Sequence, residues 1–169
     1  VIANCGTATV ACLPLTNDGR FGNTSTVIQH DGQSRNSEGK PQAHSIQISP
    51  NGNFAVAADL GLDRLFVYRL NALNGSMAPH ELKSVDLPQG NGPRHVTFHP
   101  SGRFIYVIGE LGNTVSTLRT DVDTGETVLL QNITTLSQNF SGDSYAADIV
   151  IMPDGDFLYG TNRGEDSVA

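Results

Sequence analysis

The sequence predicts an all-β fold, a β-propeller built from four-stranded antiparallel blades. The first observation is internal repetition: when Pro50, Pro100 and Pro153 are superimposed, equivalent positions coincide without a gap. The second is spacing, since successive copies lie about 50 residues apart, which matches the period of propeller blades. The third is composition, because 18 glycines punctuate short apolar runs and no segment has a convincing helical period.

Each copy contains the same architectural positions. The coinciding residues are Gly52, Gly102 and Gly155, then Phe54, Phe104 and Phe157, then Leu65, Val115 and Val168. The same repeat spacing extends to the first residues of the chain, where Val10 is equivalent to Leu65, Val115 and Val168. We therefore expect residues 1–169 to form one partial propeller domain of about three blades, truncated at both ends.

The strands follow in chain order. Alternation predicts a strand over residues 7–15 and an outer strand over residues 24–30, followed by a polar surface loop. The Pro-x-Gly segments are expected to be tight turns between the first and second strands of each blade. The remaining expected strands are 44–49, 54–58, 65–70, 82–87, 96–99, 104–108, 115–119, 128–133, 149–152, 157–161 and one starting at 168. We expect loops over 71–79, with one turn of helix within 72–77, and over 134–145.

Composition and motifs exclude several classes of function. The formal net charge of −7 gives no basic stripe for a nucleic acid. No apolar run approaches the roughly 18 residues of a membrane-spanning helix. The sequence contains no Gly-x-Ser-x-Gly elbow, phosphate loop or dinucleotide fingerprint, so neither a serine nucleophile nor a cofactor is expected.

The cysteines and glycosylation patterns bear on the compartment. Cys5 and Cys12 lie on one segment read as extended, so their Cα atoms would be about 23 Å apart, too far for a disulfide. Four Asn-x-Ser/Thr patterns begin at Asn23, Asn74, Asn132 and Asn139. The protein is cytoplasmic, or secreted if these patterns are used, and the sequence leaves both open.

Two repeat positions are expected to face one open end of the propeller, which we call the mouth. In an antiparallel meander, the start of the first strand lies beside the end of the second. These positions hold His44, Arg94 and Ala147, and Leu60, Glu110 and Arg163. Residue type changes here from blade to blade, unlike the Pro, Gly and Phe positions, which indicates a functional use. Two alternatives without a functional role stay open. These charged residues could simply lie on exposed loop edges, or Arg94 and Glu110 could form a purely structural ion pair.

Five segments resemble a known family. They are Gln42-Ala-His-Ser-Ile46, Ala58-Asp-Leu-Gly-Leu-Asp-Arg-Leu-Phe-Val-Tyr68, Gly92-Pro-Arg-His-Val-Thr-Phe-His-Pro100, Gly109-Glu-Leu-Gly112 and Thr161-Asn-Arg-Gly-Glu-Asp-Ser167. They are similar to the seven-bladed β-propeller lactonases, which include 6-phosphogluconolactonases and carboxy-cis,cis-muconate cyclases. The resemblance implies seven blades, of which this chain would hold under half.

The resemblance also implies a site. In the cyclase branch the proposed site is a His, an Arg, a Glu and a second Arg, which fall on His44, Arg94, Glu110 and Arg163. Two positions depart from the family pattern. Many relatives have a second His where Gln42 stands and an Asn where Gly109 stands. The first departure removes a proton-transfer partner, and the second alters the loop that carries Glu110.

These residue types suit lactone chemistry on a small anionic substrate. Glu110 or His44 can activate water as a base, and Arg94 and Arg163 can bind a phosphate or carboxylate. We expect a lactonase acting on an anionic sugar lactone in the manner of 6-phosphogluconolactonase, with this fragment alone inactive. A lactone-forming muconate cyclase and a secreted, non-catalytic binding propeller are the alternatives.

No metal is expected. His95 and His99 lie about 13 Å apart along a strand, too far for one ion, and we interpret both as structural. Asp59, Asp148 and Asn162 form a weaker alternative, because oxygen ligands at the mouth would suit calcium.

Overall fold

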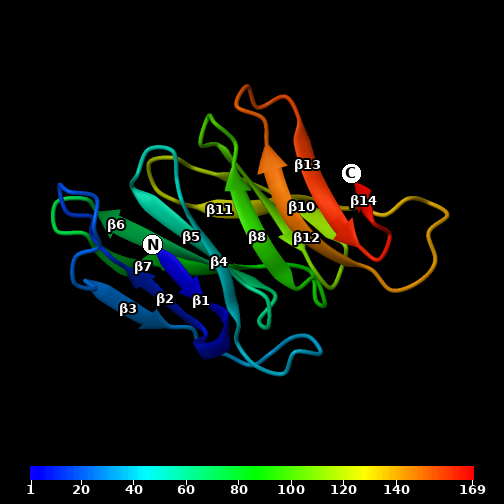
Figure 1. Cartoon of the computed structure of the whole chain (residues 1–169), viewed down its shortest axis with the longest axis horizontal. Helices are drawn as coiled ribbons and strands as arrows, with labels where there is room; N and C mark the ends of the chain where they lie inside the picture. Colours follow the sequence, from blue (N-terminus) through cyan, green and yellow to red (C-terminus); the bar gives the residue numbers. More distant parts are fainter.

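The chain forms four antiparallel sheets that stand side by side like an open fan (Figure 1). The computed structural model describes the backbone of residues 1–169 and the side chains of residues 1–81 and 84–169. The strands β4, β8 and β12 lie next to one another along the inner edge of the fan, and successive strands of each sheet run outward from them (Figure 1). This is the arrangement of propeller blades around a central axis.

The first sheet has three strands and the next two have four. The first contains β1 (Ile2–Asn4), β2 (Thr9–Cys12) and β3 (Thr26–Gln29). The second contains β4 (Ala43–Ile48), β5 (Phe54–Asp59), β6 (Arg64–Asn71) and β7 (Ser76–Asp86). The third contains β8 (Pro93–Phe98), β9 (Phe104–Gly109), β10 (Thr114–Thr120) and β11 (Thr127–Thr134). The fourth contains β12 (Tyr145–Ile151), β13 (Leu158–Arg163) and β14 (Ser167–Val168).

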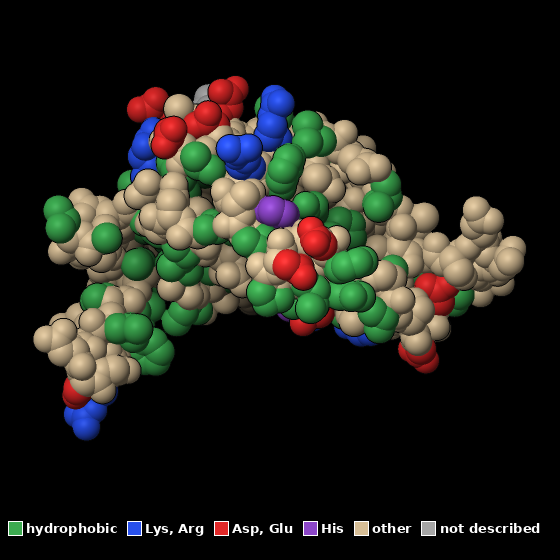
Figure 2. Space-filling view, turned by 90° about the horizontal axis from the view of Figure 1, so that it is seen from above, with side chains coloured by type: hydrophobic (Ala, Val, Ile, Leu, Met, Phe, Trp, Pro, Cys, Tyr) green, Lys and Arg blue, Asp and Glu red, His purple; other side chains and the backbone are tan. Residues whose placement is uncertain are grey.

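The Pro-x-Gly segments are tight turns between first and second strands, as the sequence predicts. Gly52, Gly102 and Gly155 have φ angles of 75°, 73° and 86°, a region that favours glycine because it has no Cβ. Each glycine N–H donates to a carbonyl three residues earlier, at 2.8–2.9 Å. Figure 2 shows the rim on which these turns lie, which is the end opposite the mouth.

The turn between second and third strands is also the same in all four sheets. Its last residue is left-handed in each case, with φ between 48° and 56° at Ala8, Asp63, Asn113 and Asp166. Asp and Asn tolerate this conformation better than other residues that carry a Cβ. The first sheet therefore follows the common template, and its three strands correspond to the second, third and fourth strands of the later sheets.

The apolar core lies mainly between neighbouring sheets. Val56 and Leu65 of the second sheet pack with Val96, Ile105 and Leu118 of the third in one cluster of buried side chains. A second cluster joins the first and second sheets. Among the described residues, no helix is long and apolar enough to cross a membrane.

The structure corrects several sequence predictions. The strand expected over 7–15 is only Thr9–Cys12, because a short 3-10 turn (Cys5–Thr7) and the left-handed Ala8 precede it. The loop expected over 71–79 is a four-residue turn, and β7 already begins at Ser76, so the turn of helix expected within 72–77 is wrong. The estimate of about three blades corresponds to two four-stranded and two three-stranded sheets. Both cysteines are free.

Candidate active site

A β-bulge lies at the mouth end of each inner strand. In β4, Ala43 pairs with Asp59 and Ser45 with Ala58, so His44 has no partner of its own in the ladder. The pairing skips Arg94 of β8 in the same way. In β12 the register shifts between Ala146 and Ile149. Bulges redirect side chains and are common beside active sites, and here they fall at the same repeat position in all three sheets.

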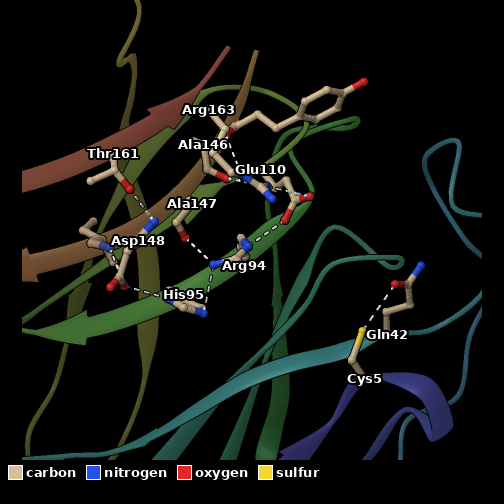
Figure 3. Close-up of polar contacts among 12 residues, drawn as sticks. Cys5, Gln42, Arg94, His95, Glu110, Ala146, Ala147, Asp148, Thr161 and Arg163 are labelled. Atoms are coloured by element: carbon tan, nitrogen blue, oxygen red, sulfur yellow. Dashed lines mark hydrogen bonds and ion pairs between the residues drawn. The ribbon is translucent and has the colours of Figure 1, made fainter. Parts of the chain in front are cut away.

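The centre of the mouth is a carboxylate held between two arginines (Figure 3). Glu110 follows β9 directly, and its Oε2 accepts from Nε of Arg94 at 2.7 Å. Its Oε1 lies 3.0 Å from Nη2 of Arg163, at the end of β13. The Arg94 and Glu110 side chains are about one-fifth exposed and Arg163 is half exposed. The cluster therefore joins the third and fourth sheets and carries one net positive charge.

Backbone carbonyls of β12 fix both arginines. Nη1 of Arg94 donates to the carbonyl of Ala147 at 2.6 Å. Arg163 donates to the carbonyls of Tyr145 and Ala146 at 3.2 and 3.4 Å. Arg94 uses different nitrogens for Glu110 and for the carbonyl of Ala147, whereas Nη2 of Arg163 contacts both Glu110 and the carbonyl of Ala146. Each guanidinium is therefore held both by the carboxylate and by the backbone of β12.

His44 lies beside this cluster, on the neighbouring inner strand. Its ring centroid is 5.4 Å from that of His95, and no described residue hydrogen-bonds to its buried Nδ1. Burial lowers the pKa of His44, and the positive charge of Arg94 acts in the same direction. The imidazole is therefore neutral near neutral pH, the form that can accept a proton.

His95 and Asp148 also belong to this network, although the sequence analysis interpreted His95 as structural. Nε2 of His95 lies 3.1 Å from Nη1 of Arg94, and Nδ1 lies 2.7 Å from Oδ1 of Asp148 (Figure 3). One signal was present in the sequence: the repeat position after His44, Arg94 and Ala147 also changes type, through Ser45, His95 and Asp148. The structure thus brings the four predicted site residues to one end of the sheets, with His95 and Asp148 hydrogen-bonded into the same network.

Comparison with known proteins places the chain in a family. The model of the seven-bladed β-propeller lactonases matches residues 1–169. The chain belongs to this lactonase family. It is 33% identical to the 6-phosphogluconolactonase of Bacillus subtilis (strain 168), over 99% of this chain and 47% of that protein. The chain thus spans about half the length of this curated relative.

Solved structures agree with this lactonase assignment. The periplasmic gluconolactonase PpgL of Pseudomonas aeruginosa superimposes with a TM-score of 0.85 at 31% identity, over 97% of this chain and 47% of that one. A protein from Lactobacillus plantarum gives a TM-score of 0.89 at 28% identity, over 98% of this chain and 48% of that one.

Gln42 and Gly109, the two positions at which the resemblance implied other residues, each have specific local contacts. The Gln42 side chain accepts from the thiol of Cys5 at 3.4 Å (Figure 3). It also donates to Glu38 at 2.7 Å, so it holds the loop before β4. A Cβ at Gly109 would overlap Asn91. The buried Asn91 side chain therefore occupies the space into which a larger residue at 109 would project.

The three residues considered for calcium do not form a cluster. Asp59 is buried against His30, Asn162 is buried against Thr135, and Asp148 is exposed and bonded to His95. Among the residues with described side chains, no group of three or more His, Cys, Asp or Glu is arranged to hold a metal ion. Asp59 and Asn162 instead link neighbouring sheets.

Proposed function

We propose that the complete protein hydrolyses a sugar lactone that carries an anionic group, in the manner of a 6-phosphogluconolactonase. The observation that carries the proposal is the cluster of Arg94, Glu110 and Arg163, which presents two fixed guanidinium groups at the mouth. The similarity to a 6-phosphogluconolactonase and to a gluconolactonase supports the same chemistry.

The two arginines are the anion-binding groups in this proposal. Glu110 balances one of their two charges and Asp148, bonded to His95, balances the other across the wider network, so the guanidinium N–H donors rather than a net charge would bind a phosphate or carboxylate. Arg163 is the more exposed of the two and is suited to the substrate's anionic substituent. Arg94 is more deeply placed and is suited to the charge that grows on the carbonyl oxygen during attack.

His44 is the better of the two candidate bases. Both carboxylate oxygens of Glu110 already interact with guanidinium groups, so this side chain is engaged in holding the two arginines. His44 is kept neutral by its lowered pKa and has no ion-pair partner among the described residues. We assign proton abstraction from water to His44, and the alignment of the arginines to Glu110.

The test is a substrate panel on the complete protein: 6-phosphoglucono-lactone, glucono-lactone, and cyclisation of carboxymuconate. We expect fastest turnover of the phosphorylated lactone. Arg94→Ala should weaken binding and slow turnover, and His44→Ala should lower kcat by about 10²–10⁴-fold, the usual range for acid–base catalysis. Arg103→Ala, which removes a charge from an exposed site on the opposite rim, is the matched control.

The other outcomes are distinct. Turnover of carboxymuconate alone would replace hydrolysis with cyclisation, and binding without turnover of any of the three would indicate a non-catalytic propeller. If Glu110→Gln abolished turnover while His44→Ala did not, the base would be Glu110. Variants that lowered only the melting temperature, with normal turnover per folded molecule, would reduce the cluster to a structural ion pair.

A further inference from the structure

The polar network at the mouth continues past Arg94 to His95 and Asp148, which the proposed hydrolysis does not use. His95 is on β8 and Asp148 is on β12, so their hydrogen bond crosses from the third sheet to the fourth. Figure 3 shows the chain of contacts from Asp148 through His95 and Arg94 to Glu110. Glu110 contacts Nε of Arg94, and His95 contacts Nη1 of the same guanidinium. Because His95 contacts a different nitrogen, it can determine the orientation of the guanidinium.

The partners determine which His95 nitrogen carries the proton. A carboxylate only accepts hydrogen bonds, so Nδ1 of His95 donates to Asp148. A guanidinium only donates, so Nε2 accepts from Nη1 of Arg94. This is the neutral tautomer with the proton on Nδ1, and Asp148 selects it. The carboxylate thereby prepares an acceptor for the arginine.

Asp148 is itself held in place. Its Oδ1 accepts the backbone N–H of Ile149 at 2.9 Å, and its own N–H donates to Oγ1 of Thr161 at 3.0 Å. Asp148 lies at the bulge in β12, and its hydrogen bond to His95 reaches β8. The direction of the His95 ring is therefore set by two strands of the fourth sheet, and through it so is one side of the Arg94 guanidinium.

The pair of His95 and Asp148 is expected to contribute little to the folding stability of the protein. The His95 side chain is 33% exposed and that of Asp148 is 70% exposed. Ion pairs as exposed as this contribute about 0–1 kcal/mol. The contact with the partly buried guanidinium of Arg94 is the feature of the pair that can affect the mouth.

We propose that His95, held by Asp148, is a positioning residue that directs the Arg94 guanidinium toward the reacting carbonyl. This inference rests on the proposed lactone hydrolysis. It assigns to the pair no contact with substrate and no proton transfer. Its effect is on the geometry of Arg94, where an error of about 1 Å can cost about 10²-fold in rate.

The experiment compares His95→Leu, His95→Gln and Asp148→Ala in the complete protein with 6-phosphoglucono-lactone. Leu cannot accept from Arg94, whereas the side-chain carbonyl of Gln can. We expect His95→Leu to lower kcat by about 10–100-fold with a smaller change in KM. His95→Gln should recover much of the lost kcat. The kcat of Asp148→Ala should lie between that of wild type and that of His95→Leu.

The matched control is His99→Leu. His99 directly follows β8, at its opposite end, where it is bonded to Ser101, so this variant should keep wild-type turnover. Melting temperatures of all variants are measured alongside. Equal loss in His95→Leu and His95→Gln, or normal kcat in His95→Leu, would overturn the positioning role. Wild-type protein inactive on every lactone would instead overturn the proposed function on which it rests.

Discussion

Two His–Asp pairs in this molecule have the same local geometry and opposite surroundings. Nδ1 of His30 lies 2.6 Å from Asp59, and Nδ1 of His95 lies 2.7 Å from Asp148. The first pair is 1% and 0% exposed, and the second is 33% and 70% exposed. The hydrogen bond itself is almost unchanged, so the surroundings determine what each pair can do.

The buried pair links the first sheet to the second. His30 follows β3, and its Nε2 bonds to the hydroxyl of Tyr68 on β6 at 2.6 Å. Asp59 also accepts backbone N–H groups from Gln42 and Leu62. Every polar atom of the pair thus has a partner inside the protein. The exposed pair instead ends on a guanidinium that faces the mouth.

Removing one partner should give the largest difference between the pairs. Asp59→Ala leaves His30 and two backbone N–H groups buried without an acceptor, so the free energy of unfolding should fall by about 3–5 kcal/mol. Asp148→Ala should cost about 0–1 kcal/mol, because water replaces the lost contact. Chemical denaturation of the complete protein measures both. Equal losses would show that burial does not separate the pairs.

The hydroxyl of Tyr68 allows a milder test of the buried pair. Burial, with a contribution from the Asp59 charge, raises the pKa of Tyr68, so the hydroxyl stays protonated. Tyr68→Phe leaves Nε2 of His30 buried without a partner and should cost about 1–3 kcal/mol in unfolding free energy. Tyr159→Phe, at an exposed tyrosine, is the control and should be neutral. A neutral Tyr68→Phe would mean that His30 needs only Asp59.

The junction between the third and fourth sheets gives a neutral version of the buried pair. Thr135 occupies the place of His30, and its hydroxyl lies 2.7 Å from Oδ1 of Asn162, which occupies the place of Asp59. Because no charge is buried, Thr135→Val should cost only about 1 kcal/mol. Denaturation under the same conditions ranks it against Asp59→Ala, and a loss as large as that of Asp59→Ala would refute the ranking.

The smallest expected effect is the pH dependence of the exposed pair. The hydrogen bond from His95 lowers the pKa of Asp148. Its stabilisation is therefore complete above the ordinary Asp pKa of about 3.9 and is lost as pH falls through the lower folded value. The stability difference between wild type and Asp148→Asn should therefore shrink as the pH falls below 4. A difference that grew on acidification would have the wrong sign.

The sequence was sufficient for the fold because its architectural residues repeat in register. Pro50, Gly52 and Phe54 recur with constant spacing, and the turns they form are the observed ones. The start of β7 at Ser76 was missed because residues 71–79 were predicted to form a loop, whereas Pro79 lies within that strand. Proline is tolerated there since β7 is an edge strand of its sheet, so the missing N–H need not face a partner strand.

The site was only partly accessible to the same reasoning. Arg94, Glu110 and Arg163 could be grouped because antiparallel pairing brings their repeat positions to one edge. His95 was interpreted as structural because it lies about 13 Å along a strand from His99, too far for the two to share a metal ion. That comparison did not include Arg94, and the bulge at Arg94 that accompanies its contact with His95 leaves no mark in the sequence.

The bulges also bear on how such a mouth can diversify. A residue that the ladder skips makes no cross-strand pair, so exchanging it leaves the pairing of its neighbours in place. His44, Arg94 and Ala147 occupy equivalent skipped positions with three different chemistries, while the strands that carry them keep the same register. Each inner strand therefore has one position at which the side chain can change without altering the pairing of the strands. Repeats that began alike can in this way acquire different roles around one ring.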